Sequence, residues 1–508
     1  MIKDPPLRWA GICAALGVVI YALMAFGVVF PQPAAPFGTD IYDAYFYRLL
    51  EGRFDLPLRM LRLEGHYASD GTGILYHGIG PLLTRALLYP FVTLHEFPTA
   101  AFSVWLWSAV GTTIYHVLAY QVINKYAGPI SVMWSVFIAV AVWIPAPGFL
   151  LTSTLVLYHE PLSVAYAGTA GVIYFFMRVA LFDMPMRRAL VPIAVLAALV
   201  LHTRPHVAVG IYAGAVIMTA LALRYEMRRA IIPAVVGMLA LGAVGMSFLE
   251  LNKARFGSAV QTHGQIDENH PDQIVQYGPV FFDTNYAVDG RGVVFIEHGR
   301  FHPWRILPNA LIYAFDMPMF DRQIETLHHN ATRDISGVGY IEAPRFGMIY
   351  VWPIWLFAAI FNMMLARPRL NGVGIKAVPV LLAAGVGALF ILSYPTVAFR
   401  YRFEVWPLVV TLALLGFPGI LHRYGTDLLG RPRLRLLSAV VLAASVGIAV
   451  FIANILAQSY HVTQSSKYRP WDAAFCQRVI AHHDFSAAEL ESICVPDTAV
   501  FTAWEERQ

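Results

Sequence analysis

Hydrophobic residues in this chain gather into long runs that are separated by short polar stretches. A helical run of about 20 apolar residues matches the thickness of a membrane's hydrocarbon layer. The pattern predicts an all-α polytopic membrane protein with about eleven transmembrane helices. We place these helices at about 9–30, 98–122, 129–148, 161–181, 189–203, 206–223, 230–250, 347–366, 376–395, 403–421 and 435–458.

Only a few polar residues separate the fifth run from the sixth. His202, Arg204, Pro205 and His206 occur together in the sequence HTRPH. An arginine is costly within lipid, and a proline interrupts a helix. We therefore interpret this stretch as a tight turn between two helices.

Lysine and arginine residues predict the orientation of the chain in the membrane. With an odd number of helices and the N-terminus in the cytoplasm, every cytoplasmic connection is basic, as the positive-inside rule requires. The C-terminus then lies outside. The basic residues on the cytoplasmic side are Lys3, Arg8, Lys125, Arg178, Arg187, Arg188, Arg224, Arg228, Arg229, Arg367, Arg369, Lys376, Arg423, Arg431, Arg433 and Arg435.

Three segments of some length then lie on the outer side. They are the outer loops 31–97 and 251–346 of a transmembrane domain that covers residues 1–458, and a small tail at 459–508. Cys476 and Cys494 both fall in the tail. A disulfide between them would close a loop of about 18 residues, worth about 3 kcal/mol, on the oxidising side of the membrane. Two free thiols are the alternative.

Composition narrows the class of protein further. Of the 508 residues, 58% are hydrophobic and 13% are charged, which excludes a string of soluble domains. The net charge of +4 follows from the basic connections, so no nucleic-acid partner is expected. No glycine-rich phosphate-binding loop precedes a helix. The first apolar run is not followed by a small-residue cleavage site, so we expect this helix to be retained. The expected location is the plasma (inner) membrane.

Carboxylates are concentrated directly after the first helix. Residues 40–51 predict a helix that Thr39 can cap, with Asp40 and Asp43 on one face of its first turn. Two carboxylates so placed can act as a general base and a supporting acid, or hold a cation. A purely structural role is the alternative, because the helix dipole favours acidic residues in the first turn of a helix. A second, amphipathic helix is predicted at 81–96, lying in the membrane interface.

Other candidate residues fall near the outer ends of the predicted helices. His159 and Glu160 in LYHEP precede the fourth helix, where Glu160 can also meet the helix N-terminus. Arginines in this region suit a phosphate at the membrane surface, and contact with lipid headgroups is the alternative. The cationic candidates are Arg204 in HTRPH, Lys253 and Arg255 in NKARFGS, and Arg400 and Arg402 in FRYRFE.

Histidines in the large outer loop do not predict a metal site. His298 and His302 have a spacing that binds metal on a helix, but Gly299 and Pro303 argue against a helix there. We expect the loop histidines, which also include His263, His270, His328 and His329, to be solvated.

Five motifs together resemble the GT-C class of polytopic glycosyltransferases, nearest to the protein mannosyltransferase and aminoarabinose transferase type. They lie in the order of that class and on the predicted outer side. The chain differs in having Ile41 after Asp40, where an acidic pair is commoner, and in its short C-terminal tail. The motifs are TDIYDAYFYRLLEGRF, LYHEP, LHTRPH, LELNKARFGSAVQTHG and FRYRFEVWPLVV.

The resemblance implies a sugar transfer from a polyprenyl-phosphate donor to an extracytoplasmic acceptor, which is a glycan, a lipid or a protein. The catalytic base would be Asp40, with Asp43 as the alternative, and the arginines would stabilise the departing lipid phosphate. No cofactor is required, although Asp43 or Glu160 would hold a divalent cation if one binds.

Two other classes stay open. A transporter or flippase predicts ionisable residues near the bilayer midplane, where the sequence has few. A polysaccharide polymerase or ligase would also use a lipid-linked substrate.

Overall fold

The computed structural model describes residues 5–30, 40–56, 61, 65–67, 73–260, 275–276, 294, 298–317, 321–333, 335–337, 341, 345–365, 374–425 and 431–466. Thr39, the two tail cysteines and the loop histidines His263 and His270 lie outside these residues. The predicted cap at Thr39 and the predicted disulfide therefore stay predictions.

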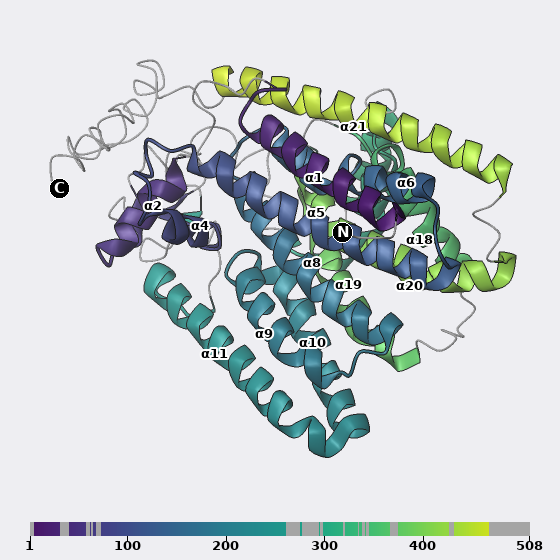
Figure 1. Ribbon diagram of the computed structural model, residues 1–508. Coiled ribbons are helices and arrows are strands. Elements are labelled where there is room, and N and C mark those ends of the chain that lie inside the picture. Colours follow the sequence, from purple (N-terminus) through teal and green to yellow (C-terminus); the bar gives the residue numbers. More distant parts are fainter. Residues whose placement is uncertain are drawn as a thin grey trace, which may run out of the picture.

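Helices dominate the described residues (Figure 1). The longer helices are α1 (Pro5–Ala25), α5 (Thr99–Ala127), α6 (Val132–Trp143), α8 (His159–Phe182), α9 (Arg187–Leu201), α10 (Pro205–Glu226), α11 (Ile231–Phe256), α18 (Pro353–Leu365), α19 (Val378–Leu392), α20 (Arg402–Tyr424) and α21 (Pro432–Ser466). Shorter helices are α2 (Ile41–Leu50), α4 (Leu82–Leu88), α7 (Pro147–Thr152), α15 (Ile306–Phe315), α16 (Asp321–Thr332) and α17 (Met348–Val351).

A helix lies at each of the eleven predicted apolar runs. Seven helical segments among the described residues are long and apolar enough to cross a membrane, as in a multi-pass membrane protein. Two runs are broken near prolines: α6 ends before Pro145, and α18 begins at Pro353 after the short α17. The number of crossings and the orientation stay predictions.

Helix α8 forms the centre of the bundle. Within its most apolar stretch 83% of the residues are buried, whereas the corresponding shares are 22% in α1, 17% in α11 and 28% in α21. Figure 1 accordingly shows α11 and α21 at opposite edges of the bundle. Helix α8 packs on α5 and α9 and also contacts α20. Residues at the start of α8 are thus held by the most buried of the seven candidate spans.

Glycines allow α10 to pack closely on α19. Gly210 and Gly214 lie one helical turn apart on α10. A Cβ atom would lie 2.4 Å from the carbonyl oxygen of Pro379 at Gly214, and 2.6 Å from that of Leu382 at Gly210. Small residues at this spacing bring membrane helices into backbone contact. The pair of helices that α10 and α19 form lines one side of the cavity described below.

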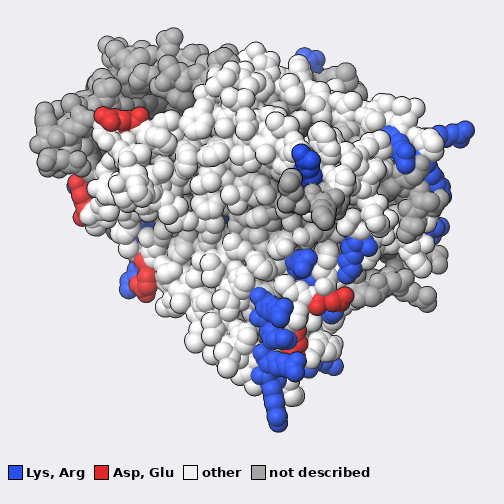
Figure 2. Space-filling model, viewed as in Figure 1, with Lys and Arg blue, Asp and Glu red and all other residues white. Residues whose placement is uncertain are grey.

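Basic connections meet at one end of the bundle. Asp183, after α8, lies 3.9 Å from Lys125 at the end of α5 and 3.4 Å from Lys376 before α19. Arg187 at the start of α9 pairs with Glu226 at the end of α10, at 2.9 Å. Figure 2 shows Lys and Arg side chains gathered around this end, where α10 turns into α11.

The opposite end carries parts of both long outer loops. A four-stranded antiparallel sheet there has the order β1 (Asp55–Leu56), β3 (Gly73–Leu75), β2 (Gly65–Tyr67) and β4 (Val275–Gln276). The sheet joins the first outer loop to the second, because β2 pairs with β4. The sequence pattern did not predict these short strands.

Helices α2 and α4 lie beside this sheet. The first matches the predicted helix at 40–51. The second ends at Leu88, well short of the predicted residue 96. Tyr89 is still in the helical conformation, but Pro90 has no N–H group to continue the helical hydrogen bonds. Leu83, Leu87 and Phe91 expose apolar side chains, a pattern that fits the predicted interfacial position.

Replacing Gly214 with alanine tests the packing of α10 on α19. The added Cβ atom forces the two backbones apart, so we expect a loss of about 1–3 kcal/mol of stability and a melting temperature several degrees lower in detergent. Gly242→Ala on α11 is the control, because no heavy atom lies within 4 Å of a Cβ atom there. Equal melting temperatures for the two variants would contradict the close contact.

Candidate functional site

A buried ion cluster joins three helices at the end of the bundle that carries the small sheet. Nε of Arg85 on α4 donates a hydrogen bond of 2.8 Å to Oδ1 of Asp43 on α2. Nη1 of the same guanidinium contacts Oε1 of Glu160 in the first turn of α8. Exposed fractions are 0% for Arg85, 6% for Asp43 and 2% for Glu160. Two of the predicted carboxylates therefore meet, with an arginine between them.

The charges in this cluster do not balance, because two carboxylates share one guanidinium. Burial disfavours the ionised form of a carboxyl group, whereas a nearby cation favours it. For Asp43, burial outweighs the lowering effect of Arg85, and together with a smaller effect of the neighbouring Asp40 it raises the pKa to about 6. The carboxyl group of Asp43 therefore keeps its proton to a higher pH than a solvated aspartate does.

Asp40, the first candidate for the base, occupies the N-cap position of α2. Its side chain makes no capping hydrogen bond to the helix. The residue is half-buried and lies close enough to Asp43 to change the pKa of that residue. The two aspartates therefore form one interacting pair, as their spacing predicts.

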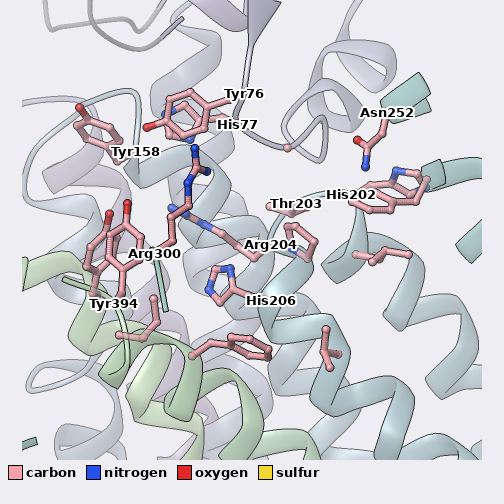
Figure 3. A pocket seen from close by; sticks show the side chains of 18 of the residues that line it. Tyr76, His77, Tyr158, His202, Thr203, Arg204, His206, Asn252, Arg300 and Tyr394 are labelled. Carbon is pink, nitrogen blue, oxygen red and sulfur yellow. The ribbon is translucent and has the colours of Figure 1, made fainter. Parts of the chain in front are cut away.

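A cavity of about 420 Å³ opens beside the ion cluster. Arginines line one part of it, and apolar side chains from α10, α11 and α19 line another. Figure 3 shows Arg204 and Arg300 in the middle of the cavity, with Tyr158 and Tyr394 on one side and His202 and Asn252 on the other. The four arginines are Arg204, Arg255, Arg300 and Arg400, and the apolar residues include Val209, Phe248, Leu251, Phe301, Phe390 and Ile391.

Glu404 on α20 fixes two of the cavity residues. Its Oε1 atom lies 3.3 Å from Nε of Arg204, and Oε2 lies 2.9 Å from Nε2 of His206. Arg204 ends the predicted tight turn, which occupies residues 202–204 between α9 and α10. The carboxylate of one helix thus orients the basic side chains that the turn presents.

Backbone carbonyls and aromatic rings hold the other arginines. Arg255 donates to the carbonyl oxygens of Leu75 and His77, the second at 3.0 Å. The guanidinium carbon of Arg400 lies 4.0 Å from the centroid of the Tyr158 ring and 5.2 Å from that of Tyr401. Such cation–π contacts orient a guanidinium and do not neutralise its charge. These contacts fix where the two guanidiniums lie at the cavity.

The segment 77–80 forms the wall between the cavity and the ion cluster. The hydroxyl of Tyr42, next to Asp43 in the chain, donates to the carbonyl oxygen of Gly78 at 3.2 Å. On the other side Gly80 lies against the turn, because a Cβ atom there would be 1.9 Å from Oγ1 of Thr203. Glycine is thus required where the outer loop meets the turn, and the cluster and the cavity share this wall.

The structure brings some predicted residues together and separates others. Arg204, Arg255 and Arg400 line the cavity, and Asp43 and Glu160 meet at Arg85. His159 is buried with its Nδ1 atom 2.8 Å from the carbonyl oxygen of Thr154, so its ring is held by backbone. Two further residues lie away from the cavity lining: Lys253 is exposed, and Arg402 is buried and pairs with Asp316 at 3.4 Å.

Several residues of the site carried no usable signal in the sequence. Arg85 occurs in the apolar stretch PLLTRALL, which suggested an interfacial helix and not a buried charge. Glu404 follows the predicted arginines of FRYRFE but was not itself identified. Only the neighbouring helices reveal the partners of these two residues.

One expectation about the loop histidines is wrong. His328, on α16, is only 3% exposed, and its Nε2 atom lies 2.8 Å from Oδ1 of Asn309. Burial lowers the pKa of His328 to about 4, so this ring is a neutral packing element and not a solvated one. Within the described ranges no group of three His, Cys, Asp or Glu side chains is close enough to hold a metal ion.

No protein-family model matches the chain, and no curated protein matches it either. Several chains of solved structures resemble its fold. One is the Archaeoglobus fulgidus oligosaccharyltransferase in the apo form, at 14% identity and a TM-score of 0.45, with 97% of this chain and 61% of that chain covered. Another is the archaeal oligosaccharyltransferase AglB from Archaeoglobus fulgidus in complex with an inhibitory peptide and a dolichol-phosphate, also at 14% identity and a TM-score of 0.45, with 89% and 55% covered.

The chain thus spans about three fifths of the length of these structures or less. A likeness at this level does not establish a shared activity, so the function proposed below depends on the cavity and the charges beside it.

The raised pKa of Asp43 predicts a pH dependence of stability. Between pH 4 and 6 the folded protein retains a proton that the unfolded chain releases, so stability falls as the pH rises through this range and levels off above it. In Asp43→Asn, the part of this decline in stability that comes from Asp43 should disappear. Thermal unfolding from pH 4 to pH 7.5 measures the difference.

Asp55→Asn serves as the control for this experiment, because Asp55 pairs with Arg53 at the surface and such pairs contribute less than about 1 kcal/mol. It should follow the wild-type curve closely. Parallel curves for the wild type and Asp43→Asn would contradict the raised pKa.

Proposed function

We propose that this protein is a GT-C class glycosyltransferase that moves a sugar from a polyprenyl-phosphate donor to an acceptor on the extracytoplasmic side of the membrane. The observation that supports it best is a cavity with a cationic part and an apolar part, which shares a wall with a buried carboxylate cluster. No soluble nucleotide sugar is available outside the cytoplasm, so an activated sugar has to arrive on a lipid.

The cavity suits the two chemical parts of such a donor. Four guanidiniums line it, and Glu404 pairs with that of Arg204. Arginine binds phosphate oxygens through paired N–H groups. The apolar side chains from α10, α11 and α19 can contact the first isoprene units. Because α11 packs at the edge of the bundle, the lipid chain can leave the cavity toward the membrane beside this helix.

Tyrosines are suited to bind the sugar. Tyr76, Tyr158 and Tyr394 line the cavity on the side nearest the arginines (Figure 3). An aromatic face packs against the C–H surface of a sugar ring, and the tyrosine hydroxyls can bond to sugar hydroxyls. The acceptor, whether a glycan, a lipid or a protein, would approach from the outer loops that the small sheet joins.

The transfer is a direct displacement at the anomeric carbon. An acceptor hydroxyl attacks this carbon, and its proton passes to the carboxylate of Asp40. The bond from the anomeric carbon to the phosphate oxygen breaks, and the lipid phosphate leaves with the electron pair. Arg204, Arg255 and Arg400 stabilise the charge that develops on it. A single displacement of this kind inverts the configuration of the sugar.

A transporter is a weaker candidate. The buried charges among the described residues cluster at the outer helix ends, around the start of α8, α10 and α20. Transport sites usually lie at the midplane between helices that are broken there. A polymerase or ligase shares the chemistry proposed here and differs in the donor, which would be a lipid pyrophosphate oligosaccharide.

Replacing Asp40 with asparagine tests the assignment of the base. Loss of general-base catalysis costs about 100-fold or more, so we expect at least that decrease in the release of polyprenyl phosphate. The assay supplies membranes containing the variant with polyprenyl-phosphate monosaccharides. The control is Glu51→Gln at the exposed end of α2, which should keep its activity. Full activity in correctly inserted Asp40→Asn and Asp43→Asn variants would contradict the proposed mechanism.

Replacing Arg400 with alanine tests the phosphate site. A hydrogen bond to a charged group contributes about 1.5–3 kcal/mol, so binding of polyprenyl phosphate to the protein in nanodiscs should weaken about 10-fold or more. Arg423→Ala, exposed at the opposite end of α20, provides the control. Unchanged binding in Arg400→Ala would contradict the proposed site. Tighter binding of polyprenyl pyrophosphate than of the monophosphate would favour the polymerase alternative.

A further inference from the structure

The guanidinium of Arg85 occupies the place between two carboxylates from different helices. Its Nε atom bonds to Asp43 on α2, and its Nη1 atom contacts Glu160 on α8. Its guanidinium carbon lies 5.6 Å from the centroid of the Tyr42 ring. The side chain is fully buried, and Nη2 has no hydrogen-bond partner among the described residues.

Two buried carboxylates side by side repel each other unless a positive charge or a proton separates them. A divalent cation bound to carboxylate oxygens is the common solution in a site that must keep both groups ionised. Arginine offers another solution, because its planar fork can bond to two acceptors at once and stays charged at any physiological pH. Here the fork belongs to the chain itself.

We propose that Arg85 is a built-in cation, which holds Asp43 and Glu160 together so that this cluster works without a divalent metal ion. Arg85 is then a positioning residue. It ties α2, which carries Asp40, to the start of α8, the most buried helix of the bundle. The role of Arg85 in catalysis rests on the proposed glycosyl transfer. The proposal that Arg85 takes the place of a metal ion in the cluster does not depend on that function.

Removing the guanidinium should turn the cluster into a metal site. In Arg85→Ala the two carboxylates lose their counter-charge and retain their place on α2 and α8, so they gain affinity for a divalent ion. Titration of the full chain in detergent with Mn²⁺ at pH 7.5, followed by electron paramagnetic resonance, should show extra bound Mn²⁺ in this variant only. The double variant with Arg85→Ala and Asp43→Asn should not bind this extra Mn²⁺.

Arg53→Ala is the matched control for the titration. Arg53 also lies in the first outer loop and also pairs with a carboxylate, that of Asp55 at 2.7 Å, but this pair is exposed and involves one carboxylate only. It should bind no more Mn²⁺ than the wild type. A folded Arg85→Ala chain with the same Mn²⁺ binding as the wild type overturns the proposal.

Activity gives a second readout that a merely structural role would not change. Transfer by the wild type should be unaffected by a chelator. Arg85→Ala should lose at least 10-fold in rate and recover part of it with Mn²⁺, whereas Arg85→Lys, which keeps the charge, should retain activity that Mn²⁺ does not increase. Loss of wild-type activity on chelation, with recovery on adding Mn²⁺, overturns the proposal even if Arg85→Ala does not fold.

Failure of the glycosyltransferase proposal is distinguishable from failure of this one. If the wild-type protein transfers no sugar from any polyprenyl-phosphate donor, the proposed function is wrong. The Mn²⁺ titration still decides whether Arg85 holds the place of a metal ion.

Discussion

A charge buried inside an apolar helix bundle needs a counter-charge or hydrogen-bond acceptors within the fold, and this constraint organises the end of the bundle that carries the small sheet. Arg85 meets Asp43 and Glu160, Arg204 meets Glu404, and Arg402 meets Asp316. Each pair joins helices that are far apart in the sequence. Breaking one partner of such a pair leaves an uncompensated buried charge, which costs far more than the pair itself contributes. These contacts therefore fix the positions of helix ends more strictly than apolar packing alone does.

Carboxylates and guanidiniums are divided unevenly between the two parts of the site. In the ion cluster two carboxylates contact the one guanidinium of Arg85, whereas four arginines line the cavity, where Glu404 pairs with Arg204. Only the segment 77–80 and the side chain of Tyr42 separate the two. A base needs excess negative charge and a departing phosphate needs excess positive charge. In the proposed transfer the carboxylates would act on the attacking hydroxyl, and the guanidiniums would act on the departing phosphate.

The helices could be predicted from the sequence, and the site could be predicted only in part. Lipid requires each spanning segment to satisfy its own backbone hydrogen bonds, so a run such as 161–181 reveals its helix without reference to any neighbour. The turn at Arg204 and the helix at 40–51 were also accessible, because proline and local spacing determine them. The strand pairing of His66 with Gln276 and the burial of Arg85 depend on contacts between distant segments. No local pattern encodes such contacts, and an arginine in an amphipathic stretch therefore looked like an exposed one.

The same reasoning explains why two neighbouring basic motifs divide as they do. In NKARFGS, Lys253 and Arg255 lie two residues apart on α11 and so point to different sides of the helix, one outward and one toward the carbonyl oxygens of segment 75–77. In FRYRFE, Arg400 precedes α20 and reaches the cavity, whereas Arg402 begins the helix and turns to Asp316. Motif matching assigns all four residues to one role. Helical geometry assigns one residue of each pair to the cavity and the other to the surface or to the framework that holds it.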